Sequence, residues 1–451
     1  MKEEKMKNKS LSQKISSNPA LFLSLGFAIL IIIGGLLLSL PVFTKSGKPT
    51  NFIDSLFVAA SASCVTGLTT VNTASHWNTY GHVLLIILIQ IGGLGVMTLA
   101  TFFPLLLRKK IGLKSRQILK EQMNIDSLNG IMKLFKYVLI FTFVVEFIGA
   151  FLLSLRFVPA YGMGKGWWYS IFHSISAFCN AGFDLLGDSI YPLRNDLLVN
   201  LTLMGLVVIG GLGFMVTAEI FKKRNFKKLT VHSRLVLIIS GVLLVLGTLV
   251  FFLIERQAGG VLYKESLRNS LIQSSFQSVS ARTAGFYSVD LSKIKSASVL
   301  FLIILMIIGG SPGSTAGGLK TTTFGVLILS TISMIKNEDE VTIFKRHIDP
   351  KTIRKALAII MVYIGLIFTV IFILSLSENF SIIDISYEVS SAFATVGASR
   401  GITGDLSNLA KILLLISMYL GRIGPMTMAY SLGLKSKTKY IRYPEANISI
   451  G

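Results

Sequence analysis

The sequence predicts an all-α integral membrane protein, with four covalently linked helix–pore-loop–helix repeats around one central pore. Three observations predict this fold class. The chain is 52% hydrophobic and 15% charged over 451 residues, which is far more apolar than a soluble chain of that length. Several apolar runs are long enough to cross a bilayer. One short motif that contains a glycine occurs four times.

The apolar runs supply the first elements. They include residues 21–40, 83–107, 138–155 and 236–254. A membrane-spanning helix needs about 20 predominantly apolar residues. The first run follows a basic segment, but it is longer than a signal-peptide core and lacks a clear small-residue cleavage site. We therefore expect it to be a retained span.

The basic residues predict the orientation of the chain. The formal net charge is +22, and the basic clusters lie at residues 2–14, 108–116, 222–228, 345–354 and 435–442. These are the ends of the chain and the loops between repeats, so the charge does not indicate nucleic-acid binding. The alternate loops carry fewer Lys and Arg residues. The positive-inside rule thus predicts a multi-pass protein of the cell membrane with both termini in the cytoplasm.

The repeated motif supplies the remaining elements. It reads SASCVTGLTT, SAFCNAGFDL, SVSARTAGFYS and SAFATVGASRG, and its glycines are Gly67, Gly182, Gly285 and Gly397. Short helices should precede these glycines at residues 53–64, 169–179, 271–282 and 383–394. All are too short to span a membrane. With two spans in each repeat, we expect about eight transmembrane helices and four re-entrant helices.

The period of the motif sets the boundaries of the repeats. We expect them at residues 19–110, 131–224, 233–336 and 354–434. Residues 1–18 and 435–451 should be cytoplasmic segments. If each short helix enters and leaves on the outer side, every loop between repeats is cytoplasmic, which agrees with the basic clusters.

A re-entrant helix that ends in glycine indicates a lined cavity. Irregular backbone at membrane depth is tolerated only where it is buried in protein or lines water. Glycine adopts left-handed conformations at no steric cost, so the carbonyls after each helix can turn toward a common axis. The alternative interpretation is that each glycine only caps a helix. Repetition at four equivalent positions favours the shared axis.

Acidic residues follow the glycines on the outer side of the membrane. They are Asp184, Asp188, Asp290 and Asp405. Such carboxylates could concentrate cations at a pore mouth. The alternative is that they are ordinary solvated loop residues.

With its four glycine segments, the paired motifs IGGLG (residues 91–95) and IGGLGF (209–214), and GGSPGSTAGGLKT (309–321), the chain resembles the Trk/Ktr/HKT superfamily of potassium transporters. It is most similar to the membrane subunit of bacterial Ktr systems. The resemblance covers nearly the whole chain. It implies potassium as the transported ion and leaves open a coupling or activating role for sodium. It also implies a homodimer in the lipid membrane, on a cytoplasmic ring of nucleotide-binding (RCK or KtrA-like) regulatory subunits.

The resemblance also implies a filter whose backbone carbonyls bind potassium. A glycine, rather than a serine, in the first loop goes with potassium preference in that family. Only the fourth loop keeps TVG, so we expect fewer defined ion sites than in tetrameric channels. The implied filter residues are Val65, Thr66, Gly67, Leu68, Asn180, Ala181, Gly182, Phe183, Thr283, Ala284, Gly285, Phe286, Thr395, Val396, Gly397 and Ala398.

The second span of the third repeat is interrupted by residues that cannot continue a helix. A broken helix at membrane depth should line a cavity, and the resemblance implies that this segment gates the pore. The alternative is a static kink. The gate residues expected here are Gly309, Gly310, Ser311, Pro312, Gly313, Ser314, Thr315, Ala316, Gly317, Gly318 and Lys320.

Arg422 lies within the apolar run 412–434. An ionisable residue at that depth is a functional candidate, and the resemblance implies an electrostatic barrier under the filter. The alternative is a buried pair with a carboxylate such as Glu146, which is itself within a span.

No enzyme motif is present. GSTAGGLKT resembles a phosphate-binding loop, but Leu319 separates Gly318 from Lys320, so ATP binding is not expected. Cys64 and Cys179 predict neither a disulfide framework nor a metal site, and no covalent cofactor is expected. Three other classes were weighed: an inverted-repeat cation transporter, a membrane-embedded enzyme, and the potassium-binding subunit of a pump. The first needs repeats of alternating orientation, the second a catalytic cluster, and the third extra spans.

Overall fold

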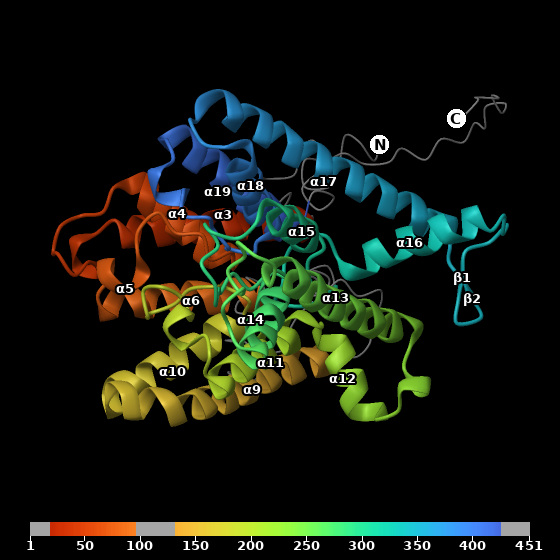
Figure 1. Cartoon of the computed structure of the whole chain (residues 1–451), viewed down its shortest axis with the longest axis horizontal. Helices are drawn as coiled ribbons and strands as arrows, with labels where there is room; N and C mark the ends of the chain where they lie inside the picture. Colours follow the sequence, from red (N-terminus) through yellow and green to blue (C-terminus); the bar gives the residue numbers. More distant parts are fainter. Residues whose placement is uncertain (1–18, 96–130, 425–451) are drawn as a thin grey trace, which may run out of the picture.

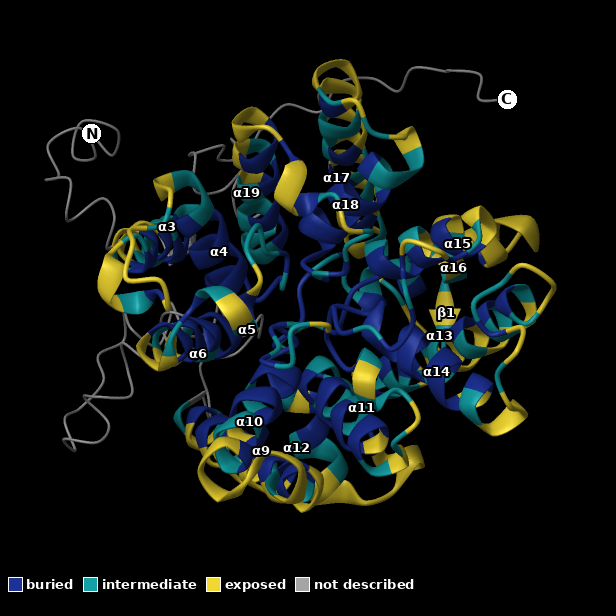
Figure 2. Cartoon of the chain, turned by 60° about the vertical axis from the view of Figure 1, so that its left-hand side comes forward, coloured by how far each residue is buried: buried dark blue, intermediate teal, exposed yellow. Residues whose placement is uncertain are grey.

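Four similar groups of helices surround a common centre (Figure 2). The structure, a computed structural model, describes residues 19–95 and 131–424. Each group consists of a first helix, a short helix followed by a loop, and a second helix (Figure 1). The expected cytoplasmic segments, residues 96–110 of the first repeat and residues 425–434 of the fourth lie outside the described residues.

The first helix of each group is long and apolar. These helices are α3 (Pro19–Leu38), α9 (Ile131–Tyr161), α13 (Val231–Glu255) and α17 (Pro350–Ser377). All four are long and apolar enough to cross a membrane. Large apolar side chains such as Ile32, Phe147 and Phe368 are exposed on their outer surfaces. Such surfaces suit contact with lipid chains.

The short helices lie inside this outer set and are largely buried. They are α4 (Phe52–Cys64), α10 (Met163–Phe178), α14 (Leu267–Ser280) and α18 (Ile382–Ala394). Side chains cap the N-termini of three of them, because Asn51, Ser266 and Ser381 accept hydrogen bonds from backbone N–H groups of the first turn. The sequence predicted all four helices, but it placed their first residues up to six positions after the observed ones.

The second helices are shorter than the first helices. They are α6 (Thr79–Leu94), α11 (Leu197–Gly211), α15 (Ser296–Ile307) and α19 (Asn408–Ile423). After α6 and α19 the chain turns at Gly95 and Gly424, with φ of 88° and 85°. Gly213 has the same conformation, φ 94°, and the next helix, α12 (Phe214–Lys223), is bent by 99° from α11.

This break differs from the sequence prediction, which placed an interruption only in the third repeat. There the interruption is present, between α15 and α16 (Thr321–Ile335). Glycine accounts for the additional breaks because a side chain at φ near 90° is strained. The IGGLG motifs therefore end helices rather than lie within them.

Short elements complete the described chain. A two-stranded antiparallel ribbon lies between α16 and α17, with Thr342 paired to His347. The remaining elements are η1 (Pro41–Phe43), α5 (Thr73–His76), η2 (Tyr191–Leu193), η3 (Phe226–Lys228), β1 (Thr342–Ile343), β2 (Arg346–His347) and η4 (Thr403–Asp405). Both cysteines are free and buried, as expected.

Candidate functional site

The four motif glycines form a closed ring of backbone contacts. A methyl group built on any of them would lie within 2.7 Å of a carbonyl oxygen in the next repeat. The pairs are Gly67 with Ala181, Gly182 with Ala284, Gly285 with Val396, and Gly397 with Thr66. The contacts run from the first repeat to the fourth and back to the first. The four loops therefore meet around one axis, and a side chain at any of these glycines would displace a carbonyl of the next loop.

The same backbone distortion precedes each glycine. The residue two positions earlier is left-handed, with φ of 57° at Val65, 58° at Asn180, 71° at Thr283 and 51° at Thr395. β-Branched residues such as valine and threonine avoid this region, so the surrounding structure must impose it. The glycines also have positive φ, of 103°, 71°, 74° and 89° in chain order. Glycine is thus required by both conformation and close approach.

A serine near the end of each short helix fastens the loop behind the ring. In the first and fourth repeats, Ser61 and Ser391 accept hydrogen bonds from the N–H groups of the motif glycines, at 2.9 and 3.0 Å. In the second repeat, the Ser176 hydroxyl donates to the Phe183 carbonyl at 2.7 Å. In the third, Ser280 donates to the carbonyl of Phe286. The serine of the repeated motif is therefore a structural support.

The residue after each glycine anchors its loop in the protein. Leu68, Phe183, Phe286 and Ala398 are all at most 1% exposed and belong to the hydrophobic clusters of the core. Because these side chains are held in the core, each loop is anchored directly after its glycine. All 16 residues that the resemblance implied thus lie in the four converging loops.

A cavity of about 590 Å³ lies on the outer side of the ring and is lined by all four glycines. Asp184, Asp188 and Asp290 line it, whereas Asp405 does not. Burial raises the pKa of Asp184 to about 6, although backbone N–H groups of Gly187 and Leu186 donate to its carboxylate. Three of the four acidic residues that follow the glycines therefore line this cavity.

Asp290 also faces cationic neighbours in this cavity. Its carboxylate pairs with Lys293 at 2.8 Å. Burial alone would raise the pKa of Asp290, but hydrogen bonds from Lys293 and Ser292 hold it below its usual value. Lys293 and Arg400 line the same cavity. Its charge is therefore mixed.

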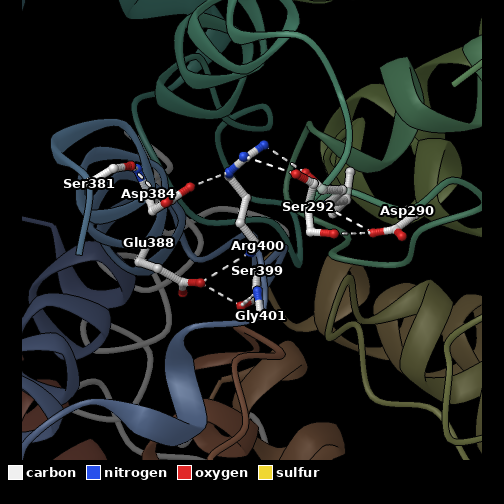
Figure 3. A network of polar contacts seen from close by, with 9 residues as sticks. Asp290, Ser292, Ser381, Asp384, Glu388, Ser399, Arg400 and Gly401 are labelled. Atoms are coloured by element: carbon white, nitrogen blue, oxygen red, sulfur yellow. Dashed lines mark hydrogen bonds and ion pairs between the residues drawn. The ribbon is translucent and has the colours of Figure 1, made fainter. Parts of the chain in front are cut away.

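Arg400 ties the fourth loop to two other elements (Figure 3). Its Nε donates to Asp384 of α18 at 2.5 Å. Its Nη1 and Nη2 donate to the carbonyls of Leu291 and Ser292, at 2.7 and 3.1 Å. A guanidinium with three such partners is held in one orientation. The sequence analysis did not single out this residue, and its place three residues after Gly397 was the only signal.

The interrupted segment of the third repeat lies against the inner side of the loops. Thr315 Oγ1 lies 3.1 Å from both the Phe178 carbonyl and Asn180 Oδ1. A methyl group on Gly317 would collide with the Thr395 side chain. The segment also bonds to α11, where Ser311 N–H donates to the Gly211 carbonyl at 3.0 Å. The segment therefore contacts the loops of the second and fourth repeats.

The Lys320 side chain folds back onto this segment. Its ammonium donates to the Ala316 carbonyl at 2.8 Å. Ser311 and Thr321 hydroxyls meet at 3.1 Å across the base of the segment. These bonds give it a defined shape.

Arg422 joins three repeats beneath the ring. Its guanidinium donates to the carbonyls of Thr315, in the interrupted segment, and of Gly92 and Gly93, at the end of α6. Among the described residues it forms no ion pair. A half-buried cation held by neutral carbonyls keeps its positive field near the axis.

Glu146 is not the partner of Arg422. It lies on α9, and its carboxylate accepts hydrogen bonds from Gln90 Nε2 at 3.1 and 3.4 Å. The alternative of a Glu146–Arg422 pair is therefore wrong. Sequence reasoning missed Gln90 because an amide directly before the IGGLG motif resembles any polar residue within a span.

Four short helices, whose loops close around one axis inside a set of long apolar helices, define a multi-pass membrane protein built from four repeats in a single chain. Comparison with known proteins assigns the family: the chain belongs to the TrkH family of cation transport proteins, whose model matches residues 24–437. The predicted resemblance and fold class are confirmed.

Two similar proteins have full-length matches. The potassium/sodium uptake protein NtpJ of Enterococcus hirae is 43% identical, over 96% of this chain and 97% of its own. The Ktr system potassium uptake protein B of Bacillus subtilis is 40% identical, over 96% and 97%. These names describe uptake proteins rather than enzymes, in agreement with the prediction.

A solved structure has the same fold. The potassium transporter TrkH from Vibrio parahaemolyticus superposes with a TM-score of 0.72 at 20% identity, covering 92% of this chain and 84% of that one. At this level of identity the match concerns the fold alone.

Proposed function

We propose that this chain is the pore-forming subunit of a potassium uptake system in the cell membrane, with both termini in the cytoplasm. The observation that carries the proposal is the closed ring of glycine–carbonyl contacts. Backbone carbonyls that face a narrow axis can replace the hydration shell of a potassium ion. We propose potassium as the ion because the names of the relatives describe potassium or potassium/sodium uptake.

Ions would lose water at the 16 residues of the four loops and then meet residues 309–318, Lys320 and Arg422. We propose that the interrupted segment is the gate, because its bonds to Phe178 and Asn180 place it against the filter loops. Arg422 would act as an electrostatic barrier. No covalent chemistry is required.

The ring also favours this proposal over the alternatives. Each repeat contacts the next in the same sense, which suits four repeats of one orientation better than the inverted repeats of a secondary transporter. A pump subunit would use a similar ring, but the matched relatives are described as uptake proteins. We further propose a homodimer on a cytoplasmic nucleotide-binding ring, and an activating or coupling role for sodium.

Growth of a potassium-uptake-deficient strain on low potassium tests the function. The full chain, produced with its cytoplasmic partner, should restore growth. A variant lacking part of residues 309–318 should admit more potassium, because the obstruction is removed. If the unmodified pair fails to restore growth, potassium uptake is the wrong function. If the deletion leaves the flux unchanged, the segment is a static kink.

A further inference from the structure

One position of the short helices carries a different kind of side chain in each repeat. The position lies three residues before the supporting serine, on the side of the helix behind the loop. Its occupants in chain order are Val58, His173, Gln277 and Glu388. In the second and fourth repeats this side chain accepts the backbone N–H three residues after the motif glycine, that of Leu185 or Arg400. The residues at the same distance from the glycine in the first and third repeats are Thr70 and Ser288. The occupants differ in chemistry although the loops share one shape.

In the second repeat the position holds a hydrogen-bond acceptor. His173 Nδ1 lies 2.7 Å from the Tyr169 carbonyl. A carbonyl only accepts, so Nδ1 carries the hydrogen and Nε2 keeps a free lone pair. Nε2 accepts the Leu185 N–H at 3.3 Å. His173 is fully buried, with its ring against Phe157 at 5.4 Å.

In the fourth repeat the same position again holds an acceptor. Glu388 Oε1 accepts the backbone N–H of Arg400 at 3.2 Å. Its second oxygen, Oε2, accepts the Thr403 hydroxyl at 3.0 Å, and Ser399 also donates to the carboxylate. Figure 3 shows this carboxylate beside Ser399 and the backbone of Arg400. Two unlike side chains thus perform one task at equivalent places.

The first and third repeats lack this support. Val58 is apolar and offers no acceptor. Both polar atoms of the buried Gln277 side chain are without a hydrogen-bond partner in the part of the chain that the structure describes. The ring contacts run in the order first, second, third, fourth. The two supported loops are therefore opposite each other across the axis.

We propose that His173 and Glu388 are positioning residues of the ion pathway, which fix two opposite filter loops through the N–H three residues past each glycine. The inference rests on the proposed function. Fixing one opposite pair keeps the distance across the axis constant, and that distance decides which dehydrated cation the carbonyls fit. The first and third loops lack this bond and can therefore adjust more as an ion passes.

Side chains of different reach at position 173 test the inference. His173→Asn keeps a donor for Tyr169 but cannot reach Leu185, whereas His173→Gln places an oxygen near the position of Nε2. Gln277→Asn also introduces the shorter asparagine at the equivalent position of the third repeat. The Gln277 side chain has no hydrogen-bond partner among the described residues, so this variant serves as the matched control. The full chain with its cytoplasmic partner is tested in cells of the uptake-deficient strain. The readout is the ratio of potassium uptake to sodium uptake, measured separately.

His173→Asn should lower this ratio about fivefold, the factor expected for one lost hydrogen bond. His173→Gln and Gln277→Asn should stay within about twofold of the unmodified protein. An unchanged ratio in His173→Asn, or an equal loss in the Asn and Gln variants, overturns the inference. If His173→Asn does not fold, Glu388→Asn against Glu388→Gln repeats the test, and equal ratios overturn it. Failure of the unmodified protein to take up potassium would instead refute the proposed function.

Discussion

The glycine ring and the layer beneath it are both built from the four repeats, but only the ring has the same residue in all four. In the ring, all four repeats place a glycine at positive φ against a carbonyl of the next repeat. One layer lower, the second helices carry Gly93, Gly211 and Gly310 at equivalent positions, but the fourth carries Arg422. The ring keeps near-fourfold symmetry where an ion would need equal carbonyls. The lower layer breaks that symmetry with one cation and one inserted segment.

The third repeat breaks the symmetry in a second way. In the other repeats a glycine near the end of the second helix packs on the end of the short helix. A methyl group on Gly92, Gly210 or Gly421 would collide with the carbonyl of Ser63, Phe178 or Phe393, respectively. In the third repeat, Gly309 instead meets the Gly317 carbonyl of its own inserted segment. Substitutions in the glycine ring should therefore change ion selectivity, whereas substitutions in the layer beneath it should change the ion flux.

The largest effect is expected in the ring. Gly397→Ala would place a methyl group against the Thr66 carbonyl at φ 89°. The left-handed strain alone costs about 1–2 kcal/mol, and its relief must move a carbonyl of the first loop. We expect potassium uptake to fall at least about tenfold.

Uptake of potassium by cells of the deficient strain measures this effect. Gly205→Ala is the control, because a methyl group on Gly205 meets nothing within 4 Å. Normal uptake by the Gly397→Ala variant would show that the loops do not touch during transport.

A smaller and opposite effect is expected in the lower layer. Arg422→Gly gives the fourth repeat the same residue as the other three at this position and removes the cation from the axis. Potassium flux should rise by about threefold to tenfold, since a barrier of about 1 kcal/mol is removed. The potassium-to-sodium ratio should not change, because the ring is untouched. A fall in flux would indicate that Arg422 mainly holds Thr315 and Gly93 together.

The smallest effect is expected in the outer cavity. Asp184 has a pKa of about 6 because it is buried, so it is ionised at pH 7 and protonated at pH 5. Lowering the pH through 6 removes one negative charge and should weaken apparent potassium affinity about twofold. Asp184→Asn should lose this dependence, whereas Asp405→Asn, outside the cavity, should keep it. The same pH dependence in both variants would refute a role for Asp184.

The sequence predicted the parts of the molecule that are repeated. Four motifs at a near-constant period predicted the short helices and the converging glycines. A single glycine could simply cap a helix, but four at equivalent positions favour a shared axis. The inserted segment was also predictable, since Pro312 and its neighbouring glycines cannot continue a helix.

The remaining features depend on contacts between distant residues. Gly213 resembles any glycine of an apolar helix until its φ of 94° is known. Glu146 and Gln90 are 56 residues apart, and nothing local pairs them. His173 and Glu388 share a position but not a residue type, so their common task is visible only when the loops they support are superimposed.

The most direct test of the central claim is the potassium-to-sodium uptake ratio of Gly67→Ser. The serine Cβ would lie 2.6 Å from the Ala181 carbonyl and at φ 103°, so the carbonyl must move and the fit to potassium should be lost. We predict that uptake persists while the ratio falls about tenfold, as expected for a change of 1.4 kcal/mol in selectivity. The matched Gly205→Ser variant should keep the original ratio. An unchanged ratio in Gly67→Ser would contradict the assignment of the glycine ring as the filter.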